Sequence, residues 1–189
     1  MNFATRPIPT LDTSRLTLRP FELSDAKQVQ ELAGDYELAK TTANIPHPYE
    51  GGMAEDWISR HAEKWRAGDM GTWAITNKTD GNLVGCIGLD IALQHKSGEL
   101  GYWVGRPYWG NGYGTEAAQA VVDYAFMTLK LHRIMGRHMS ENPASSRIMQ
   151  KVGMTYEGMM REAEIRWGNR VDICFYGILQ HEWAASRKG

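Results

Sequence analysis

Three segments that follow one another between residues 98 and 126 constrain the fold most: an extended apolar run, a glycine-rich turn and an amphipathic run. The run GELGYWVG is typical of a strand, and residues 115–129 place their apolar side chains on one helical stripe. The turn between them, WGNGYGT, contains Gly110, Gly112 and Gly114. A strand that enters a helix through a tight turn is typical of mixed α/β folds.

The glycine turn also predicts an anion site. The first amides of a helix lack intrahelical partners and lie at the positive end of its dipole, and glycine lets backbone approach a ligand closely. A phosphate or pyrophosphate is the natural guest, although a glycine turn that binds nothing is the alternative. The P-loop does not fit, because no Gly-Lys-Ser/Thr ends the turn. The dinucleotide fingerprint fits poorly, because Thr115 occupies its third small position.

The rest of the chain predicts a single mixed domain. Its 189 residues suffice for one sizeable core. Strand-like runs form an antiparallel meander up to about residue 104, with helical patterns at residues 25–34 and 53–69. A strand, a short helix and two strands joined at residues 167–169 follow the middle helix. We therefore predict an α/β (α+β) fold whose mostly antiparallel central sheet has about seven strands and flanking helices.

Composition excludes several classes of partner. Lys plus Arg number 21 and Asp plus Glu 22, a balance that gives no overall attraction to nucleic acid or anionic membrane. No apolar run approaches the ~20 residues of a membrane span, and the first residues lack the apolar segment of a signal peptide. The two cysteines and six histidines show no ligand spacing. We expect a cytoplasmic protein with no metal, nucleic-acid or membrane partner.

Several segments together resemble the GCN5-related N-acetyltransferases (GNAT family). Their acetyl-CoA loop has the pattern Gln/Arg-x-x-Gly-x-Gly/Ala, which Gly112 and Gly114 match, while Trp109 stands at the Gln/Arg position. The segment YWGNGYGTEA is similar to the YWGxGYxTEA variant of the ribosomal-protein N-terminal acetyltransferase branch (RimJ/RimL-like). RLTLRPF, IPHPYEGGMAEDWI and NPASSRIMQKVGM resemble further segments of that branch in the same order. The resemblance covers about residues 15–179 of a chain that we interpret as one domain, residues 1–189.

This resemblance implies an enzyme that uses acetyl-CoA as cosubstrate. The acetyl group would pass directly to a primary amine, either a protein N-terminus or a small molecule. The pyrophosphate would lie on the amides of residues 109–115, and the pantetheine arm along residues 102–104, where the amide of Val104 or a neighbour would face the thioester oxygen. The residues implied in cofactor binding are Tyr102, Trp103, Val104, Trp109, Gly110, Asn111, Gly112, Tyr113, Gly114, Thr115 and Asn142.

Two glutamates compete for the role of general base. Glu99 begins the strand before the turn, and Glu164 lies on a late strand at the spacing from Ser145 that the ribosomal branch uses. We favour Glu164, acting through water, with Ser145 protonating the leaving thiolate. Met149 stands where other members place a tyrosine acid, so that mechanism is not available from this position. Either glutamate is as well explained by a solvated strand end.

The acceptor and two rival functions stay open. Aromatic residues could line an acceptor cleft, although aromatics at helical spacing are usually core; the candidates are Tyr36, Tyr49, Trp57, Trp65 and Trp73. One rival is a non-catalytic acyl-CoA-binding sensor, and the other a nucleotide-binding oxidoreductase built on the same turn. A homodimer is an expectation of the resemblance alone, because no residue pattern points to it.

Overall fold

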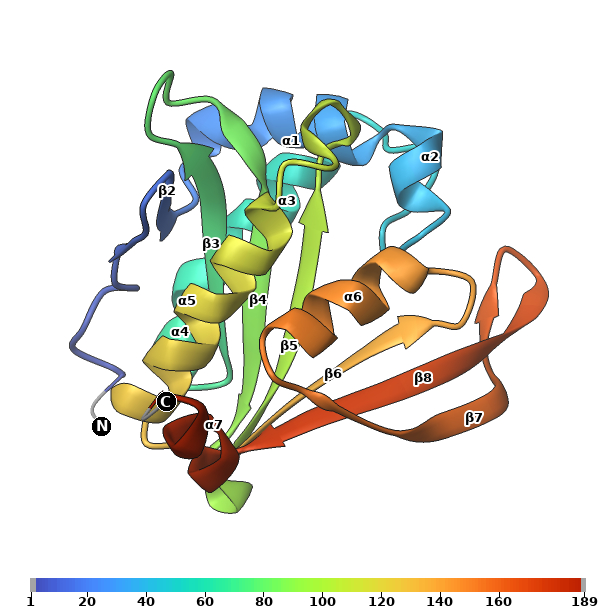
Figure 1. Cartoon of the computed structure of the whole chain (residues 1–189). Helices are drawn as coiled ribbons and strands as arrows, with labels where there is room; N and C mark the ends of the chain where they lie inside the picture. Colours follow the sequence, from blue (N-terminus) through green and yellow to red (C-terminus); the bar gives the residue numbers. More distant parts are fainter. Residues whose placement is uncertain (1–2, 188–189) are drawn as a thin grey trace.

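The computed structural model describes residues 3–187 and builds one mixed sheet from them (Figure 1). Its strand order is β1-β2-β3-β4-β5-β6-β8-β7, and every neighbouring pair is antiparallel except β5 and β6. The prediction of a mostly antiparallel sheet is confirmed, and the strand beyond the predicted seven is the two-residue β1. The strands are β1 (Leu11–Asp12), β2 (Leu16–Pro20), β3 (Met70–Asn77), β4 (Leu83–Ala92), β5 (Ser97–Val104), β6 (Arg133–Met139), β7 (Thr155–Arg166) and β8 (Asn169–Leu179).

Helices cover both faces of this sheet. In Figure 1, α5 and α6 lie in front of the strands, and α3 and α4 lie behind them. The helix predicted for residues 53–69 is in fact two helices, because Arg60 ends α3 and begins α4. The helices are α1 (Ala26–Ala33), α2 (Tyr36–Ala39), α3 (Met53–Ser59), α4 (His61–Ala67), α5 (Tyr113–Met127), α6 (Pro143–Lys151) and α7 (Gln180–Ser186). None of the described helices has the length and apolar composition needed to cross a membrane.

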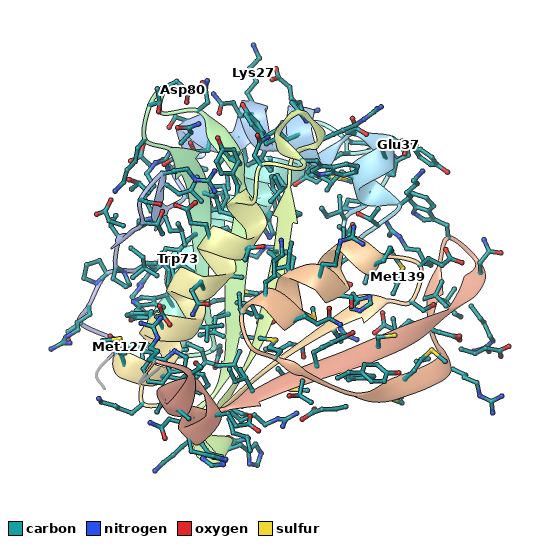
Figure 2. The ribbon with its side chains drawn as sticks, in the orientation of Figure 1. Lys27, Glu37, Trp73, Asp80, Met127 and Met139 are labelled. Carbon is teal, nitrogen blue, oxygen red and sulfur yellow. The ribbon has the colours of Figure 1, made fainter. Side chains whose placement is uncertain are left out.

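Two apolar layers show which way each strand residue points. Trp73 of β3, labelled in Figure 2, is fully buried, and its ring packs edge-on against Tyr124 of α5 with the ring centroids 6.0 Å apart. The next residue along β3, Ala74, belongs instead to the cluster formed with Val29 of α1 and Ile58 of α3. Because side chains alternate along a strand, every second residue of β3, β4 and β5 faces the same layer.

The parallel pair in the middle of the sheet comes apart. β5 and β6 are paired only from Ser97 with Arg133 to Leu100 with Gly136. Beyond that point β5 stays paired with β4 up to Val104, while β6 stays paired with β8 up to Met139. The two strands diverge in Figure 1, and a cavity of about 1100 Å³ extends from this gap to both faces of the sheet.

Candidate active site

The cavity has two halves, which we name from the view in Figure 1. The front half is bounded by the turn at residues 109–115 and by α6, and the back half by α3 and by the back faces of β3 to β7. Front-half residues include Tyr102, Val104, Trp109, Gly112, Asn142 and Ser145. Back-half residues include Trp57, Thr72, Asp90, Glu99, Arg137 and Glu164. All of the predicted cofactor and catalytic residues except Asn111 line this cavity.

The free edge of β5 is the main feature of the gap. The amide of Gly105 donates to the carbonyl of Val84 at 2.8 Å, which identifies these residues as a hydrogen-bonded antiparallel pair. Such pairs alternate, so the amides and carbonyls of Tyr102 and Val104 point away from β4 and into the gap. The intervening Trp103 instead pairs with Cys86 and packs on the back layer. An extended ligand with amide groups, such as a pantetheine arm, fits this edge as an added strand.

Trp109 stands where the family pattern has Gln or Arg, and its indole makes a contact that holds the turn. Its indole Nε1 donates to the carbonyl of Val104 at 2.6 Å, although the side chain is 44% exposed. The indole therefore hydrogen-bonds to the last carbonyl of the β5 edge and connects the glycine turn to the strand before it. The amide and carbonyl of Tyr102 and the amide of Val104 still face the gap.

The glycine turn has the geometry predicted for an anion site. Gly110 and Gly112 adopt φ of 79° and 78°, and Gly112 is the N-cap of α5. A Cβ at Gly114 would lie 2.9 Å from Cδ1 of Ile148, so any larger residue at this position would require the Ile148 side chain to shift away from the first turn of α5. The amides at the start of a fifteen-residue helix therefore border the cavity where a phosphate would be held.

A polar network outside the cavity supports the turn, and sequence reasoning missed it. Glu116 accepts hydrogen bonds from Thr13, Ser14 and Arg15, and Arg15 also donates to the carbonyl of Asn111 at 3.0 Å. Burial alone would raise the pKa of Glu116, but these hydrogen bonds lower it to about 2. The glutamate of the TEA segment thus holds the turn and takes no part in the chemistry of the cavity. In the sequence, the only indication of this role was that Glu116 lies one helical turn after Gly112.

Ser145 lies at the start of α6 with an unexpected partner. Its Oγ is 2.8 Å from Oη of Tyr102, and the same Oη donates to the Ser145 carbonyl at 3.1 Å. Burial raises the pKa of Tyr102 to about 12, so its phenol stays protonated near neutral pH. Met149 is 1% exposed and belongs to the core. The tyrosine that contacts this helix therefore comes from β5 and not from position 149 of the helix itself.

Asn142 joins α6 to the wall of the cavity. Its Oδ1 accepts from the amide of Ser145 at 3.2 Å, which makes it the helix N-cap, and its Nδ2 donates to the carbonyl of Thr41 at 3.0 Å. Both amide atoms thus have partners within the chain. Asn142 fixes where Ser145 stands and where the loop after α2 lies.

Arg137 of β6 gathers both candidate bases in the back half. Its Nε donates to Oε1 of Glu99 at 2.8 Å, and its Nη1 pairs with Glu164. Glu99 lies one residue before the last paired position of β5, so both carboxylates stand where the strands begin to part. Sequence reasoning named the two glutamates but missed the arginine that holds them together.

Two further polar groups of the back half were also missed. Asp90 lies opposite Glu99 on β4, and partial burial together with the Glu99 carboxylate raises its pKa. Thr72 is 3% exposed, and its hydroxyl has no hydrogen-bond partner among residues 3–187. Strand alternation places both on the same face as Glu99. The alternation of side chains along a strand could predict that these residues share a face with Glu99. That prediction, however, requires knowing which strands are neighbours.

The aromatic candidates divide between core and cavity. Trp65 and Trp73 are buried in the core, whereas Tyr49 and Trp57 line the cavity. Tyr36 stacks on Trp167 of the late hairpin, with centroids 5.5 Å apart. Beside this stack, Arg166 donates to the carbonyl of Ala39 at the end of α2 and to those of Ala43 and Ile45 in the loop that follows. The late hairpin and this loop therefore form one wall.

Comparisons with known proteins agree with this geometry. The family model described as "Acetyltransferase (GNAT) domain" matches residues 15–155. The "Uncharacterized N-acetyltransferase p20" of Bacillus licheniformis is 32% identical, over 93% of this chain and 98% of its own length. The spermidine N(1)-acetyltransferase of Escherichia coli K12 is 27% identical, over 90% and 89%.

A solved structure shares the fold. The ribosomal L7/L12 alpha-N-protein acetyltransferase RimL, determined in complex with coenzyme A, has a TM-score of 0.82 at 19% identity, with 90% of this chain and 98% of that one covered. The family match and the p20 relative, together with the open strand edge beside a glycine turn, show that this chain belongs to the GNAT family and is an acetyl-CoA-dependent N-acetyltransferase that acts on an amine.

Proposed function

We propose that the protein acetylates a small primary amine that carries further positive charge, with acetyl-CoA in the front half of the cavity and the amine in the back half. One observation carries this proposal: Arg137 holds Glu99 and Glu164 at the point where β5 and β6 separate, so carboxylates meet the open strand edge. The reacting groups could thus approach each other from opposite faces of the sheet.

In the front half, the backbone would position the thioester. The amides of residues 109–115 would bind the pyrophosphate, and the free edge of β5 would hold the pantetheine arm. The amide of Val104, or that of Tyr102, would donate to the thioester oxygen and stabilise the negative charge that develops on it. These donors are part of a paired strand, so they need little rearrangement in the transition state.

Three side chains would move the protons. Glu164, through a water molecule, would accept the proton that the attacking amine loses as its nitrogen bonds to the carbonyl carbon. Ser145 would supply a proton to the sulfur as the C–S bond breaks, and its oxygen would regain a proton from the neighbouring phenol of Tyr102, which solvent would reprotonate in turn. Tyr102 supports that role, because its phenol is within hydrogen-bond distance of the serine hydroxyl and stays neutral near pH 7.

Charge in the back half supports a cationic acceptor. Among the described residues that line this half, Asp90, Glu99 and Glu164 face one guanidinium, that of Arg137, and the other cation, Arg60, pairs with Asp56 at 2.9 Å. The back half therefore has an excess of negative charge, which attracts amines and raises their local concentration. The name of the spermidine-acetylating relative agrees with such an acceptor, whereas that of RimL points to a protein N-terminus.

Thiol release from acetyl-CoA across a panel of monoamines, diamines, polyamines and peptides tests the proposal. We expect the highest kcat/KM with diamines or polyamines. A preference for peptides would contradict the acceptor assignment. Binding of CoA without thiol release on any amine would indicate the sensor function instead.

Matched substitutions test the base. Glu164→Gln should lower kcat about 100-fold or more, and Glu63→Gln, an exposed glutamate on α4 outside the cavity, should leave it unchanged. A larger loss in Glu99→Gln than in Glu164→Gln would transfer the role to Glu99. Full turnover in Ser145→Ala would remove the serine from the mechanism.

A further inference from the structure

The front half of the cavity contains two cations whose role is not explained by the reaction. Arg147 and Lys151 both line the cavity from α6. They are four residues apart, so they share one face of the helix. In the part of the chain that the structure describes, neither has a carboxylate within 4.0 Å, unlike Arg60 and Arg137, the other cations of the cavity wall. Their charge thus faces the cavity without a partner.

Packing places these cations beside the glycine turn. Ile148, which follows Arg147, contacts the first turn of α5 so closely that a Cβ on Gly114 would lie 2.9 Å from its Cδ1. Lys151 comes one turn after Arg147, so both cations lie to the same side of Ile148 around α6, with Lys151 the nearer of the two. An anion held by the turn amides therefore has both cations next to it.

Coenzyme A carries more phosphate than the turn accounts for. The amides at the start of α5 suit the pyrophosphate, but the ribose bears a further phosphomonoester with about −1.5 to −2 charges near pH 7. Guanidinium offers two parallel N–H donors to such a group, and ammonium adds a point charge. Backbone amides cannot supply that charge.

We propose that Arg147 and Lys151 form a subsite for the 3′-phosphate of coenzyme A. The subsite makes the protein select acetyl-CoA over donors that lack this phosphate. This inference rests on the use of acetyl-CoA and is independent of the amine acceptor and of the base.

Two donors that differ only in this group test the subsite: acetyl-CoA and 3′-dephospho-acetyl-CoA. For the unmodified protein we expect a KM at least tenfold lower for acetyl-CoA. Arg147→Gln and Lys151→Gln should each raise the KM for acetyl-CoA about tenfold, with kcat and the KM for the dephospho donor within twofold. The control Arg161→Gln removes an exposed cation from β7, outside the cavity, and should change neither donor.

Calorimetric binding of CoA and 3′-dephospho-CoA gives a second measurement that needs no turnover. It decides the question even if no amine in the panel is acetylated or if a variant fails to fold, because the unmodified protein alone must discriminate. Equal affinity of the unmodified protein for the two ligands would overturn the proposal. Equal weakening of both ligands by Arg147→Gln and Lys151→Gln would also overturn it, since the cations would then serve the pyrophosphate or the position of α6.

Discussion

The front and back halves of the cavity are built in different ways. The front half consists mainly of backbone: the amides of the turn and the open edge of β5, shaped by Gly112 and Gly114 and fixed by Trp109. The back half consists of side chains from separate strands, such as Asp90, Glu99 and Arg137. One half can thus bind the same cosubstrate throughout a family, while the other can change its acceptor by a few substitutions. A substitution in one half alone should therefore change the kinetic constants of one substrate and leave those of the other nearly unchanged.

The largest expected effect is loss of cosubstrate binding when the turn is disturbed. Gly112→Val forces a β-branched residue into φ of 78° and fills the space beside the turn amides, so the KM for acetyl-CoA should rise about 100-fold or more while the KM for the amine stays within a few-fold. Steady-state kinetics with each substrate varied measures this. Gly81→Val is the matched control, because Gly81 has φ of 71° in the turn between β3 and β4, away from the cavity.

Lowering the pH should reduce the stability of the fold through different groups behind the sheet and in front of it. His61, behind the sheet, is 5% exposed and packs edge-on against Trp57, with centroids 4.3 Å apart. Burial, followed by the charges of Lys64 and Arg60, lowers its pKa from 6.5 to about 4. The unfolded chain therefore binds more protons between these pH values, and stability should fall as pH drops through this window, by about 3 kcal/mol in total. Glu116, in the front layer, should lower the free energy of unfolding only below about pH 4.5, because the stabilisation that its carboxylate gives is lost as the pH falls toward its folded pKa of about 2.

Urea unfolding at pH 7 and pH 5 measures this effect. The unmodified protein should lose about 2 kcal/mol more than His61→Phe, which keeps an aromatic ring but cannot bind a proton. Equal losses in the two proteins would show that His61 is not the group responsible.

A smaller effect is expected from adding a side chain to the β5 surface that faces the back half. Gly101 lies opposite Gly88 in the sheet, and a Cβ at Gly101 would meet nothing within 4 Å. Gly101→Val should therefore fold and yet occupy acceptor space, lowering kcat/KM for the amine about tenfold with the KM for acetyl-CoA within twofold. Gly51→Val, also in open space but outside the cavity, is the control. A rise in the KM for acetyl-CoA alone would show that this surface belongs to the cosubstrate.

The same contrast explains what could be predicted from the sequence. The strand, turn and helix at residues 98–126 are local, so hydrophobic periodicity and glycine spacing predicted them and the ligand chemistry of the turn. Arg137 and Asp90 were not predicted, because they meet Glu99 only through the pairing of β4, β5 and β6. Tyr102 was predicted for its backbone, and the contact of its phenol with Ser145 depends on where α6 packs. The break at Arg60 was missed because one helical pattern continues across it.

The smallest expected effect concerns Trp109, whose indole connects the turn to β5. Trp109→Phe keeps an aromatic ring but removes the donor to the Val104 carbonyl, one hydrogen bond of a partly exposed side chain. Such a bond contributes about 1 kcal/mol, so the KM for acetyl-CoA should rise about three- to tenfold with kcat and the amine KM nearly unchanged. Trp109→Gln restores a donor of the family's usual type and should recover part of the affinity. If Trp109→Phe lowers kcat at saturating acetyl-CoA, the indole also holds the β5 edge in the shape that the transition state needs, and the two halves are coupled through Val104.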